Sequence, residues 1–404
     1  MQPLSPSAQP RIDLVDVLRA LALLGIVTIH AMAHFSCGNY PPPDGGLMDT
    51  LNRETLFWTC LFFESKAYML FSFLFGLSFF LQMDRAGQRG EDFRLRFLWR
   101  MALLFCFGLV NTFFFDGDIL MIFAVAGVLL VPLHRMGTAA LFCLALLFLI
   151  NPLGLYNLWA EVRLPGSSLS WFQGWEIGPR HDDTLLNMAT WNFQDGLMRR
   201  IIMQITYGRL SETLGLLMLG VCAGRMRLFE QAACHKPLMV RLACLFAPLA
   251  VVLGVLHYRL PGLLPAHWRH EAAVLTSAYW SLCFVTAFVA LFCLLFHNHR
   301  RLAETASRWL APAGRMSLTC YVSQSVLFTF LFAGWGLGMA PYMGLLYSTL
   351  SGIALFGIQA LACKYWLALF RYGPLEWLWR SGTRMQWQPL RRQKHRTANA
   401  APQG

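Results

Sequence analysis

The sequence predicts an all-α, polytopic integral membrane protein with about ten transmembrane helices and both termini in the cytoplasm. The first observation is composition. Of 404 residues, 56% are hydrophobic and only 13% are charged, whereas about a quarter of the residues in a soluble domain are charged. The second is that the apolar residues form runs close to the roughly 20 residues that a spanning helix needs. The third is that basic loops alternate with non-basic loops between these runs.

Ten apolar runs follow one another, and each is expected to form one spanning helix. They cover residues 14–35, 56–82, 97–115, 118–133, 138–158, 204–224, 238–257, 272–296, 314–334 and 342–370. Every even-numbered loop and the C-terminal tail are basic, and the odd-numbered loops are not. Because basic loops stay in the cytoplasm, the pattern places both termini there and predicts an inner (plasma) membrane protein. An odd number of spans would break the alternation.

The long fifth loop divides the chain into two halves. We expect a polar N-terminal tail (1–13), a first half of five helices (14–158), an extracytoplasmic loop (159–203), a second half of five helices (204–380) and a basic cytoplasmic tail (381–404). Tryptophan and phenylalanine recur in the loop, which favours an interfacial segment over a free linker.

Charge and cysteine usage exclude several classes of protein. The net charge of +12 is spread over short loops, so it indicates membrane topology and contact with the lipid bilayer rather than binding to nucleic acid. Eleven cysteines lie mostly inside apolar runs without a CxxC pair, which is typical of small buried side chains. The chain has no zinc signature, P-loop or nucleophile elbow, so we expect no metal.

The first run carries a polar stripe. At about 100° per residue, Asp16, Arg19, His30 and His34 fall within roughly 60° of one another on a helical wheel. Ionisable groups inside a span are costly and indicate function, so we expect the stripe to face a polar cavity lined by the first, second, third and ninth helices. His30 lies about 16 Å beyond Arg19 along the helix.

Arg19 and His30 are the leading candidates of this stripe. A histidine in the outer half of the membrane suits a general base or an acyl acceptor, because its ordinary pKa of about 6.5 permits both roles. The alternatives are that Arg19 extends to the cytoplasmic interface and that His30 only bonds a neighbouring helix. His34, nearer the outer surface, is expected to line the cavity.

Two further groups of charges accompany the stripe. Glu64 and Lys66 lie in the second run and must pair or face a cavity, and Glu64 is the first candidate to orient His30. Asp116 and Asp118 flank a glycine before a run of only about 15 residues, roughly 22 Å of helix. We therefore expect this turn to dip toward the depth of His30, with Asn111 beside it. A plain ion pair and a plain exposed turn are the alternatives.

The ninth run opens with hydroxyl and amide side chains. Ser317, Thr319 and Gln324 lie in GRMSLTCYVSQS and are candidates for lining the cavity, although small polar residues commonly serve helix packing.

Several motifs resemble the YeiB-like bacterial membrane proteins, the family built on domain of unknown function 418. They are VDVLRALALLGI, MLFSFLFG, FGLVNTFFFDGDIL, LGLLMLGVCAGR, GRMSLTCYVSQS and FRYGPLEWLWR. This chain departs from the family pattern at two positions. Family members often have Asn at the position of His30, and His at the position of Asn111.

The family is similar to transmembrane acyltransferases, including heparan-α-glucosaminide N-acetyltransferases, whose first helix carries an arginine and a histidine at the spacing of Arg19 and His30. The resemblance implies that an acyl group passes from cytoplasmic acyl-CoA to a small-molecule or glycan acceptor in the envelope. It places Arg19 near the donor and gives His30 a catalytic role, with Glu64, Asp116 and Asp118 as candidate partners. The alternative is a transporter or exporter of a small polar or amphipathic solute, because transporters also hold charges such as Glu64 and Lys66 within the membrane.

Overall fold

The computed structural model describes residues 13–34, 41, 45–164, 166 and 184–392. Within these ranges the regular structure is helical, and one isolated bridge joins Phe370 to Arg391. The described residues thus agree with the predicted all-α class. The predicted tails fall mainly outside them, at residues 1–12 and 393–404.

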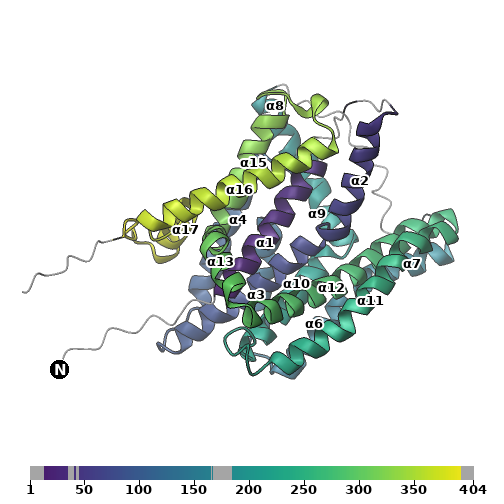
Figure 1. Ribbon diagram of the computed structural model, residues 1–404. Helices are drawn as coiled ribbons and strands as arrows, with labels where there is room; N and C mark the ends of the chain where they lie inside the picture. Colours follow the sequence, from purple (N-terminus) through teal and green to yellow (C-terminus); the bar gives the residue numbers. More distant parts are fainter. Residues whose placement is uncertain (1–12, 35–40, 42–44, 165, 167–183, 393–404) are drawn as a thin grey trace, which may run out of the picture.

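In its described residues, the first part of the chain is a succession of helices (Figure 1). Its helices are α1 (Asp13–Ile29), the π-helical η1 (His30–His34), α2 (Leu47–Phe62), α3 (Lys66–Gly87), α4 (Arg94–Thr112), α5 (Leu120–Leu133), α6 (Thr138–Leu149) and α7 (Pro152–Arg163).

The second part begins with short helices and continues with long ones. They are α8 (Leu185–Trp191), the π-helical η3 (Asn192–Gly196), α9 (Leu197–Thr206), α10 (Arg209–Arg225), α11 (Lys236–Leu263), α12 (Ala266–Asn298), α13 (Arg300–Trp309), α14 (Ala311–Arg315), α15 (Ser317–Phe332), the 3₁₀-helical η4 (Ala340–Tyr342), α16 (Leu345–Leu369) and α17 (Pro374–Arg384).

Seven helical segments in the described part of the chain are long and apolar enough to cross a membrane. Two of the predicted spans, α5 and α15, are apolar but only 14 and 16 residues long, which is short for a bilayer core of about 30 Å. The protein is therefore a multi-pass membrane protein, while the count of ten spans and the position of the termini stay predictions.

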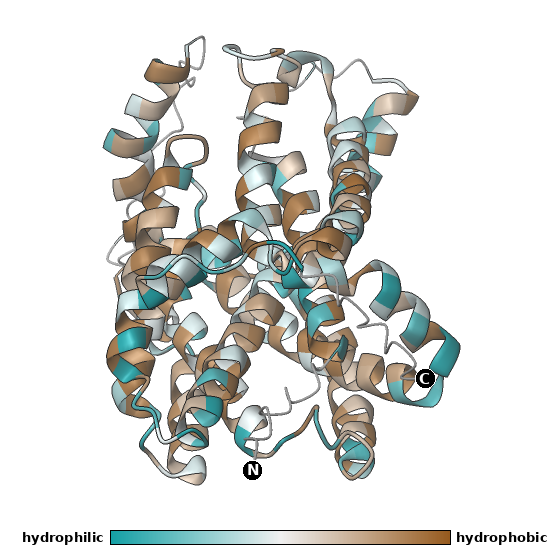
Figure 2. Ribbon diagram, turned by 90° about the vertical axis from the view of Figure 1, so that its left-hand side faces the viewer, coloured by the Kyte–Doolittle hydropathy of each residue, from teal (hydrophilic) through white to brown (hydrophobic). Residues whose placement is uncertain are grey.

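Helix α1 lies at the centre of the bundle and α11 at its edge. In the most apolar window, 72% of the α1 span is buried, against 22% for α11. Leu245, Val251 and Val252 of α11 are more than half exposed, and apolar residues cover much of the helical surface (Figure 2). Soluble proteins rarely expose contiguous apolar surface of this kind, so this surface fits contact with lipid.

Two glycines allow α3 and α10 to cross closely. A Cβ atom at Gly76 would lie 2.0 Å from the carbonyl oxygen of Leu217, and one at Gly220 would lie 2.1 Å from that of Phe73. Small residues at a crossing let two helix backbones approach each other inside a membrane. This contact explains why MLFSFLFG and LGLLMLGVCAGR each carry a glycine, and it holds α3 against the core of the bundle.

Several predicted segments differ from the structure. The second and fifth apolar runs are not single helices, because the chain breaks between α2 and α3 at Ser65, whose φ is +60°, and between α6 and α7 at Asn151, whose φ is +55°. The described end of the predicted loop 159–203 is helical, since α8, η3 and most of α9 lie there. Helix α9 has a strongly polar and a strongly apolar side, and such a helix is easily missed by a search for uniformly apolar runs.

Candidate functional site

Arg19 is held in an ion-pair network at the end of the bundle where the basic connections lie, here called the basic end. Its guanidinium donates to Asp16 at 2.6 Å and to the hydroxyl of Ser78 on α3 at 2.5 Å. Arg315 donates to Asp16 at 3.2 Å and to Asp13 at 2.7 Å. Asp16 is thus shared by two arginines, and this network fixes α1 against α3 and the end of α14.

The network forms one wall of a cavity of about 990 Å³. Helices α1, α3, α4, α14 and α17 line it, together with the ends of α15 and α16. Nine arginines contribute to the lining, against three carboxylates, Asp16, Glu91 and Glu376. The arginines are Arg19, Arg85, Arg89, Arg96, Arg100, Arg315, Arg371, Arg380 and Arg384.

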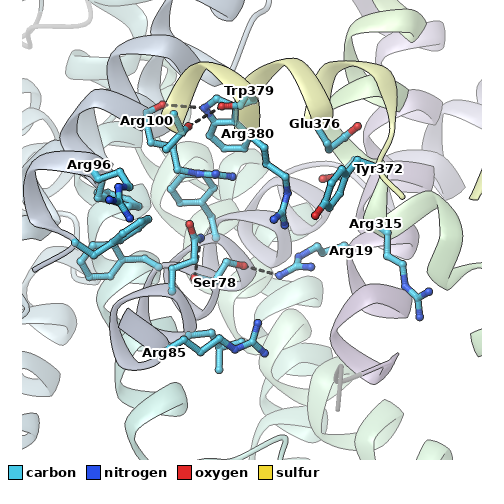
Figure 3. A pocket seen from close by; sticks show the side chains of 18 of the residues that line it. Arg19, Ser78, Arg85, Arg96, Arg100, Arg315, Tyr372, Glu376, Trp379 and Arg380 are labelled. Atoms are coloured by element: carbon cyan, nitrogen blue, oxygen red, sulfur yellow. Dashed lines mark hydrogen bonds between the residues drawn. The ribbon is translucent and has the colours of Figure 1, made fainter. Parts of the chain in front are cut away.

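Some of these arginines have unused hydrogen-bonding capacity. The Nε atoms of Arg85 and Arg100 are buried and find no acceptor among the residues that the structure describes. Buried donors normally have a partner, so these two atoms are suited to an acceptor that enters the cavity. Arg380 of α17 and Arg19 of α1 point toward one another across it (Figure 3).

Helix α17 closes the cavity on the side of α4. The guanidinium of Arg100 lies 3.5 Å from the ring centre of Trp379, whose indole N–H donates to the carbonyl of Arg100 at 2.9 Å. Trp99 of α4 donates in turn to the carbonyl of Gly382 at 3.0 Å. Cation–π stacking and two hydrogen bonds therefore dock this amphipathic helix beside the cavity.

Glu376 attaches α17 to the first turn of α15. Its carboxylate accepts the backbone N–H groups of Leu318 and Thr319 at 2.8 and 3.0 Å and the hydroxyl of Thr319 at 2.6 Å. A carboxylate at a helix N-terminus satisfies free N–H groups and interacts favourably with the helix dipole. Burial nevertheless raises the pKa of Glu376 above its ordinary value.

His30 lies in a second cluster, beyond the inner end of the cavity. It begins the π-helical turn η1, is half-buried, and its ring centre is 4.8 Å from that of Phe115 and 6.2 Å from that of Tyr321. π-Helical turns frequently mark functional sites. The cavity lining includes Arg19 but not His30, so the two residues of the polar stripe face different surroundings.

The predicted carboxylates Asp116 and Asp118 lie in the same neighbourhood. Asp118 is 2% exposed and accepts hydrogen bonds from the Asn111 amide at 2.9 Å and from the Met121 N–H at 3.1 Å. The backbone N–H of Ile119 donates to the hydroxyl of Tyr321 at 3.1 Å. Tyr321 therefore connects the Asp116–Asp118 turn to the ring contact with His30.

An aromatic cluster lies between the two regions. Arg19 contacts Ser78, and a Cβ atom at Gly25 would meet Ala67, so α1 and α3 run antiparallel in a defined register. Phe71 and Phe75 of α3 fall between these two levels. Their rings pack on Phe123 of α5, with ring centres 5.7 and 5.3 Å apart.

Glu64 and Lys66 do not have the surroundings that the sequence suggested. Glu64 lies at the break between α2 and α3, and its side chain is exposed. Lys66 is buried, donates to the carbonyl of Cys60 at 3.0 Å and lies 3.5 Å over the ring of Trp280 on α12. The break turns the side chain of Lys66 toward α12. This orientation could not be predicted from a single continuous helix.

The remaining candidates are scattered. Ser317 lines the cavity, Thr319 holds Glu376, and Gln324 donates to Gln359 of α16 at 2.8 Å inside the bundle. His34 belongs to η1, but its side chain lies outside the described part of the structure. No group of three or more His, Cys, Asp or Glu side chains in the described ranges has the geometry to hold a metal ion.

Several residues of the cavity were missed from the sequence, although the signals were present. Arg85, Arg96 and Arg100 were counted only as topology signals of a basic loop. Trp379 and Arg380 lie in FRYGPLEWLWR, which served only as a family motif. Tyr321 belongs to the second cluster and not to the cavity, and it too lies unmarked between the hydroxyl residues of the ninth run. A motif search cannot show that these segments meet around one cavity.

Fold and site together define a multi-pass helical membrane protein with an arginine-lined cavity at one end. Comparison with known families gives two matches. Residues 11–185 match the family described as "Heparan-alpha-glucosaminide N-acetyltransferase, catalytic", and residues 223–386 match "Protein of unknown function (DUF418)". The resemblance to the YeiB-like, DUF418 family and its kinship with transmembrane acyltransferases are thereby confirmed. The cavity lies where the two matched regions meet, because α1, α3 and α4 belong to the first and α14–α17 to the second.

Two relatives are similar over almost their whole length. "Uncharacterized protein YxaH" of Bacillus subtilis (strain 168) is 28% identical over 96% of this chain and 98% of its own. "Uncharacterized 39.9 kDa protein in amylase 3'region" of Bacillus acidopullulyticus is 28% identical over 92% of this chain and 94% of its own.

Proposed function

We propose that the protein is a transmembrane acyltransferase. It takes an acyl group from acyl-CoA at its basic, cytoplasmic end and transfers it to a hydroxyl or amino group of an envelope acceptor, a small molecule or a glycan, near the opposite end. The arginine-lined cavity is the observation that carries this proposal. The match of residues 11–185 to the catalytic region of an N-acetyltransferase family supports the reaction class.

The charge of the cavity fits the donor. Coenzyme A carries a pyrophosphate and a separate phosphate, and arginine binds phosphate oxygens through two parallel hydrogen bonds. The unpartnered Nε donors of Arg85 and Arg100 and the opposed side chains of Arg19 and Arg380 offer such bonds from four different helices. A neutral solute would leave most of this positive charge uncompensated.

His30 is proposed to act as the general base. The acceptor group would attack the thioester carbonyl, and His30 would take the proton that the acceptor loses. The carbon–sulfur bond would break, and CoA would leave as a thiolate that takes up the proton from the imidazolium, directly or through water. The antiparallel register of α1 and α3 places Phe71, the innermost residue of α3 in the lining, near the level of Leu23. His30 lies seven residues further, roughly 10 Å along α1. The aromatic cluster therefore lies between the donor site and His30, and its rings must move aside for the two groups to react.

Binding of unmodified CoA to the purified protein in lipid nanodiscs tests the donor site. We expect measurable affinity in the wild type and a loss of about tenfold or more in Arg19→Ala and in Arg380→Ala, because each removes a charge-assisted hydrogen bond. Arg94→Ala is the matched control, since Arg94 pairs with Asp92 in the adjacent connection and does not line the cavity. No binding by the wild type, or an equal loss in the control, would overturn the proposal.

Acyl transfer separates the enzyme from a transporter. With labelled acetyl-CoA outside proteoliposomes that contain a glycan acceptor, an acyltransferase leaves the label covalently on the acceptor. A protein that binds CoA but only moves solutes across the bilayer leaves every acceptor unmodified, and that result would favour transport instead.

A further inference from the structure

The lining of the cavity changes from cationic to apolar along α3. Arg85 and Gln82 lie toward the basic end, Ser78 lies at the level of Arg19, and Phe75 and Phe71 lie furthest inward. From Arg85 to Phe71 the helix advances by roughly 21 Å. A ligand that fills the cavity along this direction therefore passes from charged to apolar surroundings.

Helix α4 borders the same end of the cavity. Arg96 and Phe97 lie toward the basic end, Arg100 and Met101 follow one turn later, and Met101 is the innermost residue of α4 in the lining. The apolar inner end of the cavity is therefore bordered by two helices and not by one side chain.

The inner end is closed by rings. Phe123 of α5 is fully buried and packs on both Phe71 and Phe75, which are themselves half-buried. Phe71 and Phe75 both line the cavity and keep some exposed surface, so part of each ring faces the cavity. Apolar surface that faces water inside a protein favours an apolar ligand group.

We propose that this inner end, formed by Phe71, Leu74, Phe75 and Met101, is a pocket for the acyl chain. The preferred donor is then a CoA thioester of a short aliphatic acid longer than acetate. Its phosphates lie among the arginines, its flexible arm passes Arg19 and Ser78, and its hydrocarbon chain lies against Phe71 and Phe75. This inference rests on the proposed function, because it needs CoA in the cavity.

The volume of the pocket limits the length of the acyl chain that it can hold, while its apolar lining favours chains longer than acetyl. An acetyl group would leave the phenylalanine rings in contact with water, whereas each further methylene buried there tightens binding by up to about fourfold. The gain ends where the chain meets Phe123, because well-packed interiors resist added volume. Affinity is therefore expected to rise from acetyl to butanoyl and hexanoyl and to stop rising by dodecanoyl.

The test measures dissociation constants of CoA and of acetyl-, butanoyl-, hexanoyl- and dodecanoyl-CoA with the wild type in nanodiscs, after subtraction of binding to empty nanodiscs. We expect hexanoyl-CoA to bind at least tenfold more tightly than acetyl-CoA. If CoA itself does not bind, the proposed function fails. If CoA binds and the thioesters all bind equally, the donor site stands and the acyl pocket is wrong.

Pocket-filling variants localise the effect. Phe75→Trp and Phe71→Trp each add a larger ring at the inner end, and either is expected to abolish the preference for hexanoyl over acetyl while the affinity for CoA changes less than threefold. Two positions are used because one may disturb the packing on Phe123, and only a variant that still binds CoA is interpreted. Phe105→Trp, on the exposed side of α4 and outside the lining, is the control and should keep the wild-type preference. An unchanged preference in a folded pocket variant would overturn the proposal.

Discussion

The two ends of α1 differ in how they accommodate polar side chains. At the basic end, Arg19 is partly exposed beside a wide cavity, and the buried Asp16 forms ion pairs with both Arg19 and Arg315. At the other end, His30 lies among aromatic rings, and the carboxylate of Asp118 is buried and satisfied by hydrogen bonds from Asn111 and the backbone.

This difference supports the proposal that one polar stripe serves two purposes. Water in an open cavity hydrates charges and allows a charged ligand to exchange. A buried network with few free positions instead holds its groups rigidly, at a high cost if one partner is removed. In the proposed function, donor binding therefore belongs to the Arg19 end and positioned chemistry to the His30 end.

Replacement of His30 should have the largest effect. Loss of a general base typically slows a reaction by about 100-fold to 10,000-fold, so His30→Ala should lose transfer activity while binding CoA like the wild type. The measurement is the rate of label transfer together with the dissociation constant of CoA. His267→Ala, at an exposed position on α12, is the control. A joint loss of rate and CoA binding would mean that the two ends form one site.

Replacement of Asp118 should lower stability rather than binding. Asp118→Ala leaves the Asn111 amide and the Met121 N–H without their buried acceptor, and each buried unsatisfied group costs about 1–3 kcal/mol. We therefore expect a loss of about 2–5 kcal/mol in the free energy of unfolding, seen as a lower midpoint of thermal unfolding in detergent. Asp92→Ala, which breaks an exposed pair with Arg94, should cost less than about 1 kcal/mol. Equal losses would show that the turn is not a rigid element.

The sequence predicted the helical class and part of the second cluster for clear physical reasons. Long apolar runs leave few alternatives to membrane helices, and the glycine in Asp116-Gly117-Asp118 marked a turn. The grouping of His30, Asn111 and Asp118 in one region agrees with the reasoning from depth, because a short α5 draws that turn into the bundle. The break at Ser65 was not predictable, since FFESKAYML reads as a helix with a polar interruption.

The cavity itself could not be predicted from the sequence. Its arginines come from five helices and two connections. Their meeting depends on tertiary contacts such as the hydrogen bonds that Thr319 donates to Glu376 and Trp379 donates to the carbonyl of Arg100. Basic loops are ordinarily interpreted as a sign of membrane topology. The same arginines therefore give no separate sequence signal that they line a cavity. An amphipathic helix such as α17 gives no transmembrane signal, although it closes the cavity.

Loss of the contact between α17 and α4 should weaken ligand binding at the basic end and leave the His30 region unchanged. Trp379→Leu removes the ring over Arg100 and the hydrogen bond to its carbonyl, together worth about 1–2 kcal/mol. We expect roughly tenfold weaker CoA binding and no change in the stability of the His30 region, measured by hydrogen exchange. Trp387→Leu, at a largely exposed position beyond α17, is the comparison. Weaker binding in both variants would point to the whole tail rather than to this wall.

The pH dependence of stability should reveal the smallest effect, at Glu376. Burial raises the pKa of this carboxyl in the folded protein above its value in the unfolded chain, so folding favours the protonated form. Its contribution is then complete below the ordinary carboxyl pKa of about 4.3 and declines as the pH rises through the raised pKa. The wild type should therefore lose stability relative to Glu376→Gln as the pH rises above the ordinary carboxyl pKa and through the raised one, as measured by unfolding midpoints of the two proteins at each pH. The opposite slope would mean that the N–H groups of Leu318 and Thr319 stabilise the carboxylate by more than burial destabilises it, and α17 would then be attached to the cavity by a charge rather than by a neutral acid.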